Sequence, residues 1–430
     1  MSVSICGRSS KRILLLLILI IYCIVSFTYL STYGKDQSNL EPSVALFRKR
    51  PLVIWALDFH IGIRDVKDLL SPFGVTFIDR SLSKHCQFTQ TCSSGLKVID
   101  KSNGFELENP DLISKFYEVY KNDAEINSAD VFLCFYPTAM CELYVKFNKS
   151  MLIVMSSRLE TGRSTVTTFK RWLKQFKAIA ADPKNVIVAN NQYDAEYTYY
   201  FTGHRPLMLT SYCGYIGLQY KPTKQSFLLA ESRHPYFSKN FLKEFQVQAK
   251  RLNSSVKLLD MRELYGTYRY EDIASHLGLV HIPYQVSVMS FFEQYRMNIP
   301  LFFPTLQLLL KWQVEDHVLT ERTWDLMTTG IFPNKSKLAG VHPEMPDPND
   351  DSDPEAIRFW LKYSDFYNWP NIVYFDSVEN LVRLLETTNR RTLSERMKVY
   401  NKALHQSLKN DWMRILEHLA DYSGKYPRTN

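Results

Sequence analysis

Acidic and histidine side chains stand directly after several short apolar runs in this sequence. The first run, residues 52–58, ends at Asp58 and is followed two residues later by His60. A carboxylate or an imidazole at such an edge is able to take a proton from a reacting hydroxyl group. A plainer role is open to each side chain, because Asp58 can cap the helix that follows and His60 can pack as a polar residue.

A second group of polar side chains follows later apolar runs. Arg158, Glu160 and Arg163 come after the fourth run, and Asn191 comes after the fifth. The mixed charge suits the binding of a polar, hydroxyl-bearing ligand, and Glu160 is another carboxylate able to accept a proton. The alternatives are a salt-bridged loop for the charged residues and a helix cap for Asn191.

Two basic side chains follow the first apolar run of the second half of the chain. Arg233 lies in the turn after residues 226–230, and Lys239 opens the next helix. Arg offers a planar fork for two oxygens of an anion and Lys offers a point charge, so both are candidates for anion binding. A surface Arg and a surface Lys without a ligand fit the pattern equally well.

The elements that must position these residues are short apolar runs alternating with helical periodicity. Strands of four to eight residues that alternate with helices predict parallel β-α-β units. In the first half the predicted strands cover 52–58, 75–79, 129–136, 150–156, 186–189 and 206–210, and the predicted helices end near Gly74 or cover 139–147, 165–181 and 193–202. In the second half the strands cover 226–230, 256–260, 278–282, 299–304 and 371–376, and the helices cover 240–253, 270–277, 287–297 and the residues up to about Tyr422.

Two successive halves of this kind meet near residues 219–224, where the sequence Lys-Pro-Thr is typical of a linker. The predicted fold class is therefore α/β, with two Rossmann-like doubly wound domains and a cleft between them. Ligands in such folds bind at the carboxyl ends of the strands. We predict a cytosolic tail at 1–12, a transmembrane anchor at 13–30, a stem at 31–50, a first α/β domain at 51–218 and a second α/β domain at 225–430.

Composition limits the classes of function. Hydrophobic residues make up 45% and charged residues 22% of the chain, as in ordinary globular proteins. The net charge of +8 includes no run of five basic residues, so a nucleic-acid-binding arm is not predicted. Asp351 and Asp353 lie in the Pro-rich segment 347–355, which we expect to be a solvated loop, and no Cys or His spacing resembles a zinc site. We expect no resident metal and no cofactor.

Residues 13–30 form a long apolar segment. As a helix it spans roughly 27 Å, close to the thickness of a bilayer core. No small-residue cleavage site follows it, which favours an anchor over a cleaved signal peptide. Arg8, Lys11 and Arg12 flank its N-terminal side, so the positive-inside rule places the N-terminus in the cytosol and residues 31–430 in the lumen of the secretory pathway.

Three Asn-X-Ser sequons agree with a lumenal location. They begin at Asn148, Asn253 and Asn334, and we predict N-glycosylation at each.

Five cysteines fall on the lumenal side of the predicted anchor. Cys86 and Cys92 enclose a short polar segment, and we expect them to form a disulfide in this oxidising compartment. Cys134 and Cys141 lie in apolar strand and helix patterns, where buried free thiols are expected. The odd count leaves at least one thiol unpaired.

The segment 270–305 resembles the donor-binding segment of GT-B glycosyltransferases. It reads YEDIASHLGLVHIPYQVSVMSFFEQYRMNIPLFFPT, which is a strand, a small loop, a helix that carries an acid, and a further strand. The resemblance implies that Glu293 accepts hydrogen bonds from the ribose hydroxyls of a nucleotide sugar. It also implies a diphosphate near Ser287, at the N-terminal end of the helix. Gln285 stands where retaining members have a second Glu, and an amide binds a sugar hydroxyl but carries no charge.

A second segment, 186–221, is similar to the end of the N-terminal half of the same enzymes. It contains a strand, a short helix, a Thr-Gly turn, another strand and an aromatic residue before the linker. Together the two segments cover about 70 residues. The order of strands and helices over 51–430 is compatible with the GT-B fold.

The resemblance implies a type II, single-pass glycosyltransferase of the Golgi or ER membrane. Such an enzyme moves a sugar from a nucleotide sugar to a hydroxyl of a glycan or glycoprotein, and commonly holds the diphosphate with basic side chains and helix dipoles instead of a metal. The implied donor site has Arg233, Lys239, Gln285, Ser287 and Glu293, the implied acceptor site has Arg158, Arg163 and Asn191, and the candidate bases are Asp58, His60 and Glu160.

Two other classes compete with this interpretation. A membrane-tethered protein that binds glycans or assembles complexes without turnover is compatible with Gln285 and with the lack of an unambiguous base. A GT-A transferase would need a divalent metal at Asp351 and Asp353, and those acids do not follow a strand, so this class is disfavoured.

Overall fold

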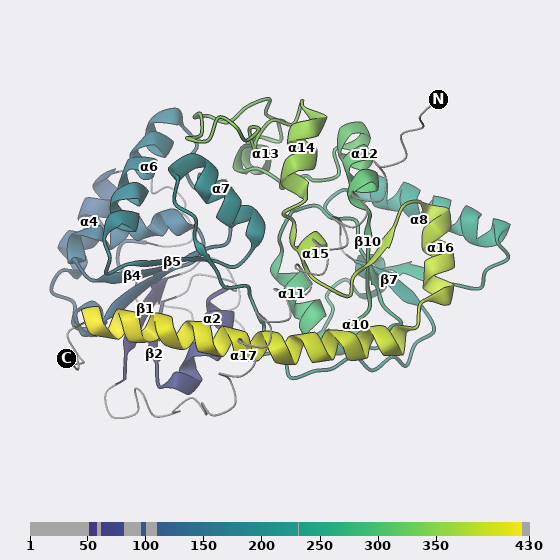
Figure 1. The fold of residues 1–430 in the computed structure, drawn as a ribbon, viewed down its shortest axis with the longest axis horizontal. Helices are drawn as coiled ribbons and strands as arrows, with labels where there is room; N and C mark the ends of the chain where they lie inside the picture. Colours follow the sequence, from purple (N-terminus) through teal and green to yellow (C-terminus); the bar gives the residue numbers. More distant parts are fainter. Residues whose placement is uncertain (1–50, 58–61, 81–95, 100–109, 231, 424–430) are drawn as a thin grey trace, which may run out of the picture. The chain divides into compact units, whose positions relative to one another are not determined.

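The computed structural model describes residues 51–57, 62–80, 96–99, 110–230 and 232–423, and Phe47–Asn430 form one compact unit (Figure 1). The predicted tail, anchor and stem lie outside the described residues, and so do Asp58, His60, Cys86 and Cys92. Within the described part of the chain, no helix combines the length and the apolar character needed to cross a membrane. The boundaries of the predicted domains therefore stay predictions.

The first sheet consists entirely of parallel strands in the order β2-β1-β3-β4-β5-β6. All six coincide with predicted strands. Apolar side chains alternate between its two faces, because successive residues of a strand point to opposite sides. The strands are β1 (Val53–Leu57), β2 (Thr76–Asp79), β3 (Val131–Cys134), β4 (Ser150–Met155), β5 (Val186–Ala189) and β6 (Leu207–Met208).

Helices cover both faces of this sheet. Trp55 and Leu57 belong to the core on one face, whereas Ile54 and Ala56 belong to the core on the other. Burial on both faces explains why the strands are continuous apolar runs in the sequence. One face packs against α4 (Pro110–Tyr120), α6 (Val166–Ala181) and α7 (Gln192–Thr202), and the other against α2 (Gly62–Leu70) and α17 (Arg390–Tyr422) (Figure 1).

The second sheet is also parallel, with the order β11-β10-β9-β7-β8. In both sheets the first strand lies between the second and the third, which gives each sheet one point where the winding direction reverses. This confirms the predicted α/β class with two doubly wound parallel sheets. The strands are β7 (Phe227–Leu229), β8 (Leu258–Asp260), β9 (Leu279–Val280), β10 (Leu301–Pro304) and β11 (Val373–Phe375).

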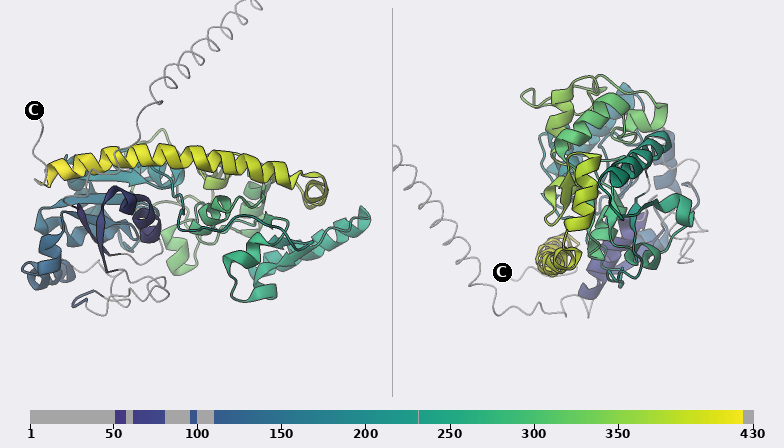
Figure 2. Two further views of the ribbon diagram at one scale, coloured as in Figure 1. Left: turned by 90° about the horizontal axis from the view of Figure 1, so that it is seen from below. Right: turned by 90° about the vertical axis from the view of Figure 1, so that its right-hand side faces the viewer.

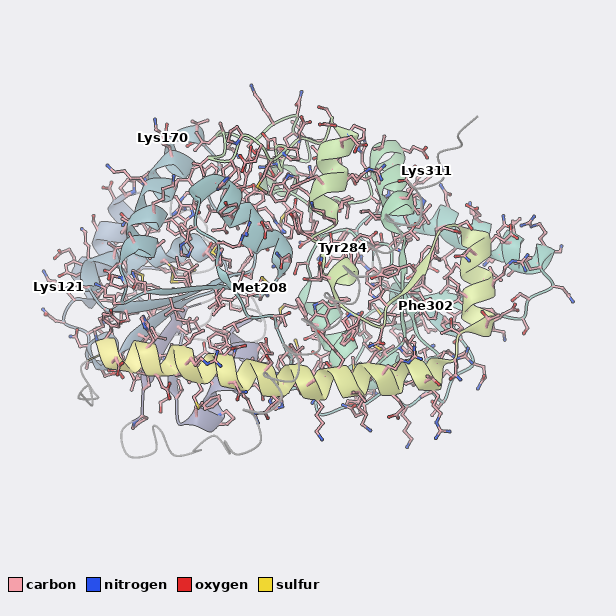
Figure 3. The ribbon with its side chains drawn as sticks, viewed as in Figure 1. Lys121, Lys170, Met208, Tyr284, Phe302 and Lys311 are labelled. Carbon is pink, nitrogen blue, oxygen red and sulfur yellow. A yellow bond between two sulfur atoms is a disulfide. The ribbon has the colours of Figure 1, made fainter. Side chains whose placement is uncertain are left out.

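The helices of the second half enclose this sheet. Lys311 points outward from its helix, whereas Phe302 lies inside on β10 and is fully buried (Figure 3). The longer helices here are α8 (Pro235–Arg251), α11 (Met289–Arg296), α12 (Leu306–Asp316), α14 (Pro354–Leu361) and α16 (Val378–Thr387), and the short ones are α9 (Met261–Tyr265), α10 (Tyr270–Ala274), α13 (Trp324–Thr329) and α15 (Asp365–Asn368).

Two predicted helices differ from the structure. The segment predicted as a helix over 139–147 forms two short 3-10 segments, η2 (Thr138–Leu143) and η3 (Val145–Phe147). Helix α8 begins at Pro235 instead of near residue 240. Its earlier start has a local cause, because proline suits the first turn and the His234 side chain accepts a hydrogen bond from the Phe237 amide at 3.2 Å.

The expectation of free thiols at Cys134 and Cys141 was wrong, because these residues form a disulfide. Strand β3 ends at Cys134 and η2 turns back beside it, which brings the two Cα atoms to 5.7 Å, within the range that a disulfide spans. Among the described cysteines, Cys213 is buried without a disulfide.

The acidic segment 347–355 is also more ordered than a solvated loop. Asp351 accepts hydrogen bonds from the fully buried guanidinium of Arg322, at 2.9 Å from Nε and 2.6 Å from Nη2. Asn349 donates to the hydroxyl of Tyr197 on α7 at 2.7 Å. A buried arginine requires a carboxylate partner, so this acidic run serves the packing of the second half against the first.

The C-terminal helix α17 belongs to both halves. Near its start, Asn401 donates to the backbone carbonyl of Tyr295 at 3.0 Å. Farther along, Leu408, Trp412 and Leu416 pack against the first sheet. Figures 1 and 2 show α17, in yellow, running beside elements of both halves. The end of the chain therefore completes the core of the first sheet.

Truncating Leu416 tests this role of α17. Leu416 is fully buried and Val399, on the same helix, is 72% exposed. We expect Leu416→Ala to lower the free energy of unfolding by about 2–5 kcal/mol, because it leaves a cavity against the first sheet. Val399→Ala is the control and should change it by less than about 0.5 kcal/mol. Equal effects in a denaturant titration would show that α17 is not part of this core.

Candidate functional site

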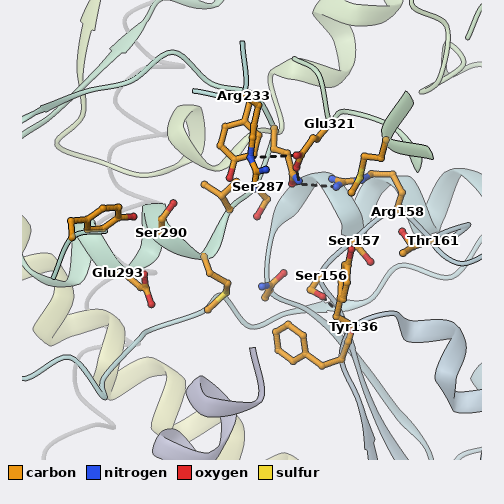
Figure 4. Close-up of a pocket in the computed structure, with 18 of the residues that line it drawn as sticks. Tyr136, Ser156, Ser157, Arg158, Thr161, Arg233, Ser287, Ser290, Glu293 and Glu321 are labelled. Atoms are coloured by element: carbon orange, nitrogen blue, oxygen red, sulfur yellow. Dashed lines mark hydrogen bonds and ion pairs between the residues drawn. The ribbon is translucent and has the colours of Figure 1, made fainter. Parts of the chain in front are cut away.

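A cavity of about 850 Å³ lies where the carboxyl ends of strands from both sheets face each other. Residues after β3, β4 and β5 line one side, and the turns after β7 and β9 line the other. The reversal points of doubly wound sheets are the usual ligand sites of such folds. The principal polar residues of the lining are Ser156, Ser157, Arg158, Thr161, Asn190, Arg233, Tyr270, Gln285, Ser287, Ser290, Glu293 and Glu321 (Figure 4).

Glu293 is the carboxylate on the α11 side of the cavity. Its Oε1 accepts hydrogen bonds from the hydroxyls of Tyr215, at 2.6 Å, and Tyr270, at 2.7 Å. Burial raises the pKa of Glu293, and these two hydrogen bonds and the charge of Arg64 oppose that rise. The second oxygen, Oε2, takes part in neither bond, and a carboxylate oxygen is able to accept a further hydrogen bond.

A chain of polar contacts crosses the cavity from one half of the protein to the other. Arg158 lies 3.5 Å from the amide oxygen of Gln285, and the amide nitrogen of Gln285 donates to Glu321 at 2.5 Å. Glu321 in turn forms an ion pair with Arg233 at 3.6 Å. Figure 4 shows these contacts as dashed lines. A glutamine both accepts and donates here, whereas a glutamate at position 285 would repel Glu321.

Arg158 is buried among acids. Its Nη1 lies 3.8 Å from Asp194, and the ring of Tyr193 lies 6.0 Å from the guanidinium carbon. Burial is the largest single effect on Arg158 and disfavours its charge, but Asp194, together with Tyr193, Glu160 and Tyr197, outweighs burial, so the pKa of the guanidinium is raised. Burial also raises the pKa of Asp194 and that of Asp365, which lies close enough to interact with both groups. The arginine therefore keeps its positive charge beside the cavity.

Two predicted site residues are buried inside the protein and do not line the cavity. Arg163 is fully buried and forms an ion pair with Glu142. Glu160 is buried and hydrogen-bonded to Tyr197, and burial raises the pKa of its carboxyl group. Neither belongs to the described lining, because the turn after β4 directs Arg158 and Thr161 there and Glu160 and Arg163 into the protein.

Two further predicted residues lie outside the cavity lining. Asn191 caps α7, where its side chain accepts from the Asp194 amide at 2.8 Å, so the plainer role holds. Lys239 is exposed on α8, whereas Arg233 in the preceding turn lines the cavity. Arg233 and Lys239 look equivalent in the sequence, but of these two cations only Arg233 lines the cavity.

The structure brings Arg158, Arg233, Gln285, Ser287 and Glu293 together in the lining. The sequence pattern did not single out Tyr215, Tyr270, Glu321 or Ser157. Ser157 carried a usable signal, since it directly follows the predicted strand 150–156, but the tyrosines and Glu321 did not.

The structure also describes the predicted glycosylation sites and the two acids Asp351 and Asp353. Asn148, Asn253 and Asn334 are all exposed, and their glycosylation stays a prediction. Asp351 is held by Arg322, and Asp353 caps α14 by accepting from the Glu355 amide. In the part of the chain that the structure describes, no three His, Cys, Asp or Glu residues are grouped so that they could hold a metal ion.

The segment that carries Tyr215 to Glu293 is fixed by a buried acid. Asp65 on α2 accepts from the backbone amides of Tyr212, at 3.0 Å, and Cys213, at 2.5 Å. Burial raises the pKa of Asp65 to about 6, although these hydrogen bonds oppose the rise.

This pKa predicts a pH dependence of stability. The folded chain holds the Asp65 proton up to about pH 6, whereas the unfolded chain releases it near pH 3.8. Below pH 3.8 Asp65 therefore contributes up to roughly 3 kcal/mol to the free energy of unfolding. This contribution is lost as the pH rises to about 6.

The Asp65→Asn variant tests it, because the amide oxygen still accepts from the backbone but does not titrate. Between pH 4.5 and pH 7 it should lose less unfolding free energy than the unmodified chain. The exposed Asp421→Asn is the control and should behave like the unmodified chain. If the unfolding free energy of Asp65→Asn falls with pH as steeply as that of the unmodified chain, the raised pKa does not belong to Asp65.

Comparisons with known proteins come from structure alone, because the chain matches neither a protein-family model nor a curated protein. One solved structure with a related arrangement is the glycosyltransferase of kitacinnamycin, with 12% identity, coverage of 86% of this chain and 100% of that one, and a TM-score of 0.44. Another is a putative UDP-N-acetylglucosamine 2-epimerase from Listeria monocytogenes, with 11% identity, coverage of 88% and 98%, and a TM-score of 0.41. These likenesses are too distant to carry a function, which must come from the cavity of this chain.

Proposed function

We propose that this protein is a glycosyltransferase that moves a sugar from a nucleotide sugar to a hydroxyl of a glycan or glycoprotein. The observation that carries the proposal is the cavity between the two sheets, with the Glu293 carboxylate on one wall and the arginines Arg158 and Arg233 on the others. A nucleoside diphosphate needs two kinds of partner. A carboxylate accepts hydrogen bonds from its ribose hydroxyls, and cations bind its phosphates.

The donor side follows from the chemistry of these groups. Two tyrosine hydroxyls fix the Glu293 carboxylate through Oε1, so Oε2 is available to a ribose hydroxyl. Arg233 offers charge-assisted hydrogen bonds to the diphosphate, and Ser287 lies just before the N-terminus of α11, where the helix dipole favours negative charge. Stabilising the departing diphosphate is the main task in such a transfer.

The acceptor side lies on the first sheet. Ser156, Ser157, Thr161 and Asn190 follow strands β4 and β5 and offer neutral donors and acceptors to saccharide hydroxyls. The Ser157 hydroxyl is buried and lacks a hydrogen-bond partner among the described residues, as expected of a group that a ligand completes. We keep Asp58 and His60, which follow β1 in the sequence and lie outside the described residues, as the candidate bases.

A lumenal location is part of the proposal. The apolar segment 13–30 would anchor the chain as a type II protein in the Golgi or ER membrane. The Cys134–Cys141 disulfide supports an oxidising compartment, and the exposed sequon asparagines are accessible to glycosylation there.

Replacing Glu293 tests the proposal. In full-length protein in detergent, we expect Glu293→Gln to weaken nucleotide-sugar binding about 10- to 100-fold, because an amide is a weaker acceptor than a carboxylate. Release of nucleoside diphosphate from a panel of nucleotide sugars should fall by at least as much. Glu244→Gln, on the exposed side of α8, is the matched control.

The panel also separates the proposal from its alternative. Binding of nucleotide sugars without transfer or release would favour a non-catalytic glycan-binding or assembly protein. Absence of any nucleotide-sugar binding would refute the proposed function.

The two basic residues of the second half provide an internal comparison. Arg233→Gln should weaken binding of nucleoside diphosphates about tenfold or more, because it removes a charge-assisted hydrogen bond. Lys239→Gln removes the same charge from an exposed site outside the cavity and should change binding less than about twofold. Calorimetry at fixed ionic strength measures both, and equal losses would show that Arg233 acts only through the net charge.

A further inference from the structure

A second, smaller cavity of about 160 Å³ adjoins the large one. It lies at the carboxyl ends of the second sheet, next to Ala230 after β7, His281 after β9 and Phe303 on β10. Six residues line both cavities, so the two spaces are neighbours: Tyr268, Tyr284, Gln285, Ser287, Val288 and Ser290. We call this space the side cavity.

One wall of the side cavity is a stack of flat rings. His281 is parallel to Phe303, with 4.3 Å between ring centroids and 4° between planes. Phe303 is stacked on Phe366 at 4.8 Å and 10°. Phe291, from α11, also lines the space. Such a wall favours a flat aromatic ligand, which gains contact over a whole face.

Three polar atoms at the side cavity have no hydrogen-bond partner among the described residues. They are Nε2 of His281, Oε1 of Gln294 and Oδ2 of Asp365, and the three residues are 8%, 3% and 3% exposed. Gln294 lies close enough to His281, and Ser287 close enough to Asp365, to affect the pKa values of His281 and Asp365. None of the three atoms reaches the distance and angle of a good hydrogen bond through these contacts. Buried polar groups are rarely left unpaired, so the three atoms point to a missing partner.

The protonation states favour a neutral partner. Burial lowers the pKa of His281 to about 3, against a smaller opposing effect of Gln294. The ring is therefore neutral at pH 7, with one donor and one acceptor. None of the described lining residues of the side cavity is Lys or Arg, whereas Arg158 and Arg233 line the large one. A phosphate belongs in the large cavity, and an uncharged ring in the side cavity.

The size limits that ring further. The side cavity is well below the roughly 300–1,000 Å³ of pockets that enclose whole small ligands. It has room for a fragment, and one six-membered ring fits it better than two fused rings.

The helix α11 connects the two spaces. Ser290 lines both cavities, Gln294 lines the side cavity, and Glu293 lines the large one. Residues three and four apart on a helix are neighbours on its surface, so Ser290 lies beside both of the later residues. Figure 4 shows Ser290 next to Glu293. A ribose at Glu293 would thus place its base at the entrance of the side cavity.

We propose that the side cavity binds the base of the nucleotide donor and selects a pyrimidine over a purine, with His281 and Gln294 reading the polar edge of the ring. This inference rests on the proposed function, because it assumes a nucleotide in the large cavity. It adds the class of base, which the large cavity does not determine.

Competition between bases tests the inference on the unmodified full-length chain. Calorimetric titration with UDP, CDP, GDP and ADP keeps the diphosphate and the ribose constant. We expect UDP or CDP to bind about tenfold or more tightly than GDP and ADP. Equal affinity for all four would overturn the inference and leave the proposed function intact, whereas no binding of any of them would overturn both.

Two variants assign the selection to named residues. His281→Phe keeps the ring stack and removes Nε2, and Gln294→Met keeps the volume and removes the amide. Each should reduce the preference for the pyrimidine nucleotide about tenfold, by weakening its binding and leaving GDP nearly unchanged. Gln246→Met, on the exposed side of α8, is the matched control.

If both variants fold, as judged by thermal unfolding, and keep the full preference, His281 and Gln294 do not read the base and the inference falls. The same holds if the side cavity contains only ordered water in a complex with UDP. Should a variant fail to fold, the four-nucleotide comparison on the unmodified chain decides alone.

Discussion

A carboxylate removed from water is tolerated only when hydrogen bonds replace its hydration, and Glu293 meets this requirement with partners from distant parts of the chain. Tyr215 comes from the segment that leaves the first sheet, and Tyr270 from the start of α10. The guanidinium carbon of Arg64, on α2, lies 4.0 Å from the ring centre of Tyr215 and adds positive charge nearby. One acid thus joins the first sheet, the connecting segment and the second sheet at the cavity wall.

The two halves also meet away from this acid, and the contacts there are aromatic and ionic. Tyr193, Tyr197 and Tyr200 lie along one face of α7 and pack around Trp360 of α14. Beside them Arg322 bonds to Asp351 and, at 3.4 Å, to the hydroxyl of Tyr193. Because these groups are buried, separating the halves would leave several polar atoms without partners. The walls of the cavity are therefore held in place before a ligand arrives, which lowers the entropic cost of binding.

The distribution of charge divides the site into two environments. The large cavity contains arginines and carboxylates in a connected chain, so a charged ligand exchanges one set of ionic contacts for another. The side cavity has flat rings and a neutral imidazole, where a charge would lose its hydration without compensation. An elongated ligand with an anionic part and an uncharged aromatic end matches both.

The sequence alone determined the strands, because burial on both faces makes a parallel strand a continuous apolar run that neighbouring residues reveal. It also placed Glu293 on a helix between two such strands, since that pattern is local. It did not determine which polar side chains meet. Tyr215 is 78 positions from Glu293, and Arg158 is 127 positions from Gln285. Arg163 and Lys239 look as suitable as Arg233, yet Arg163 turns inward to Glu142 and Lys239 faces outward. Tertiary structure decided these outcomes, because a side chain reaches a cavity only through the rotation of its own turn or helix, and a charged group finds its partner only after distant strands have packed.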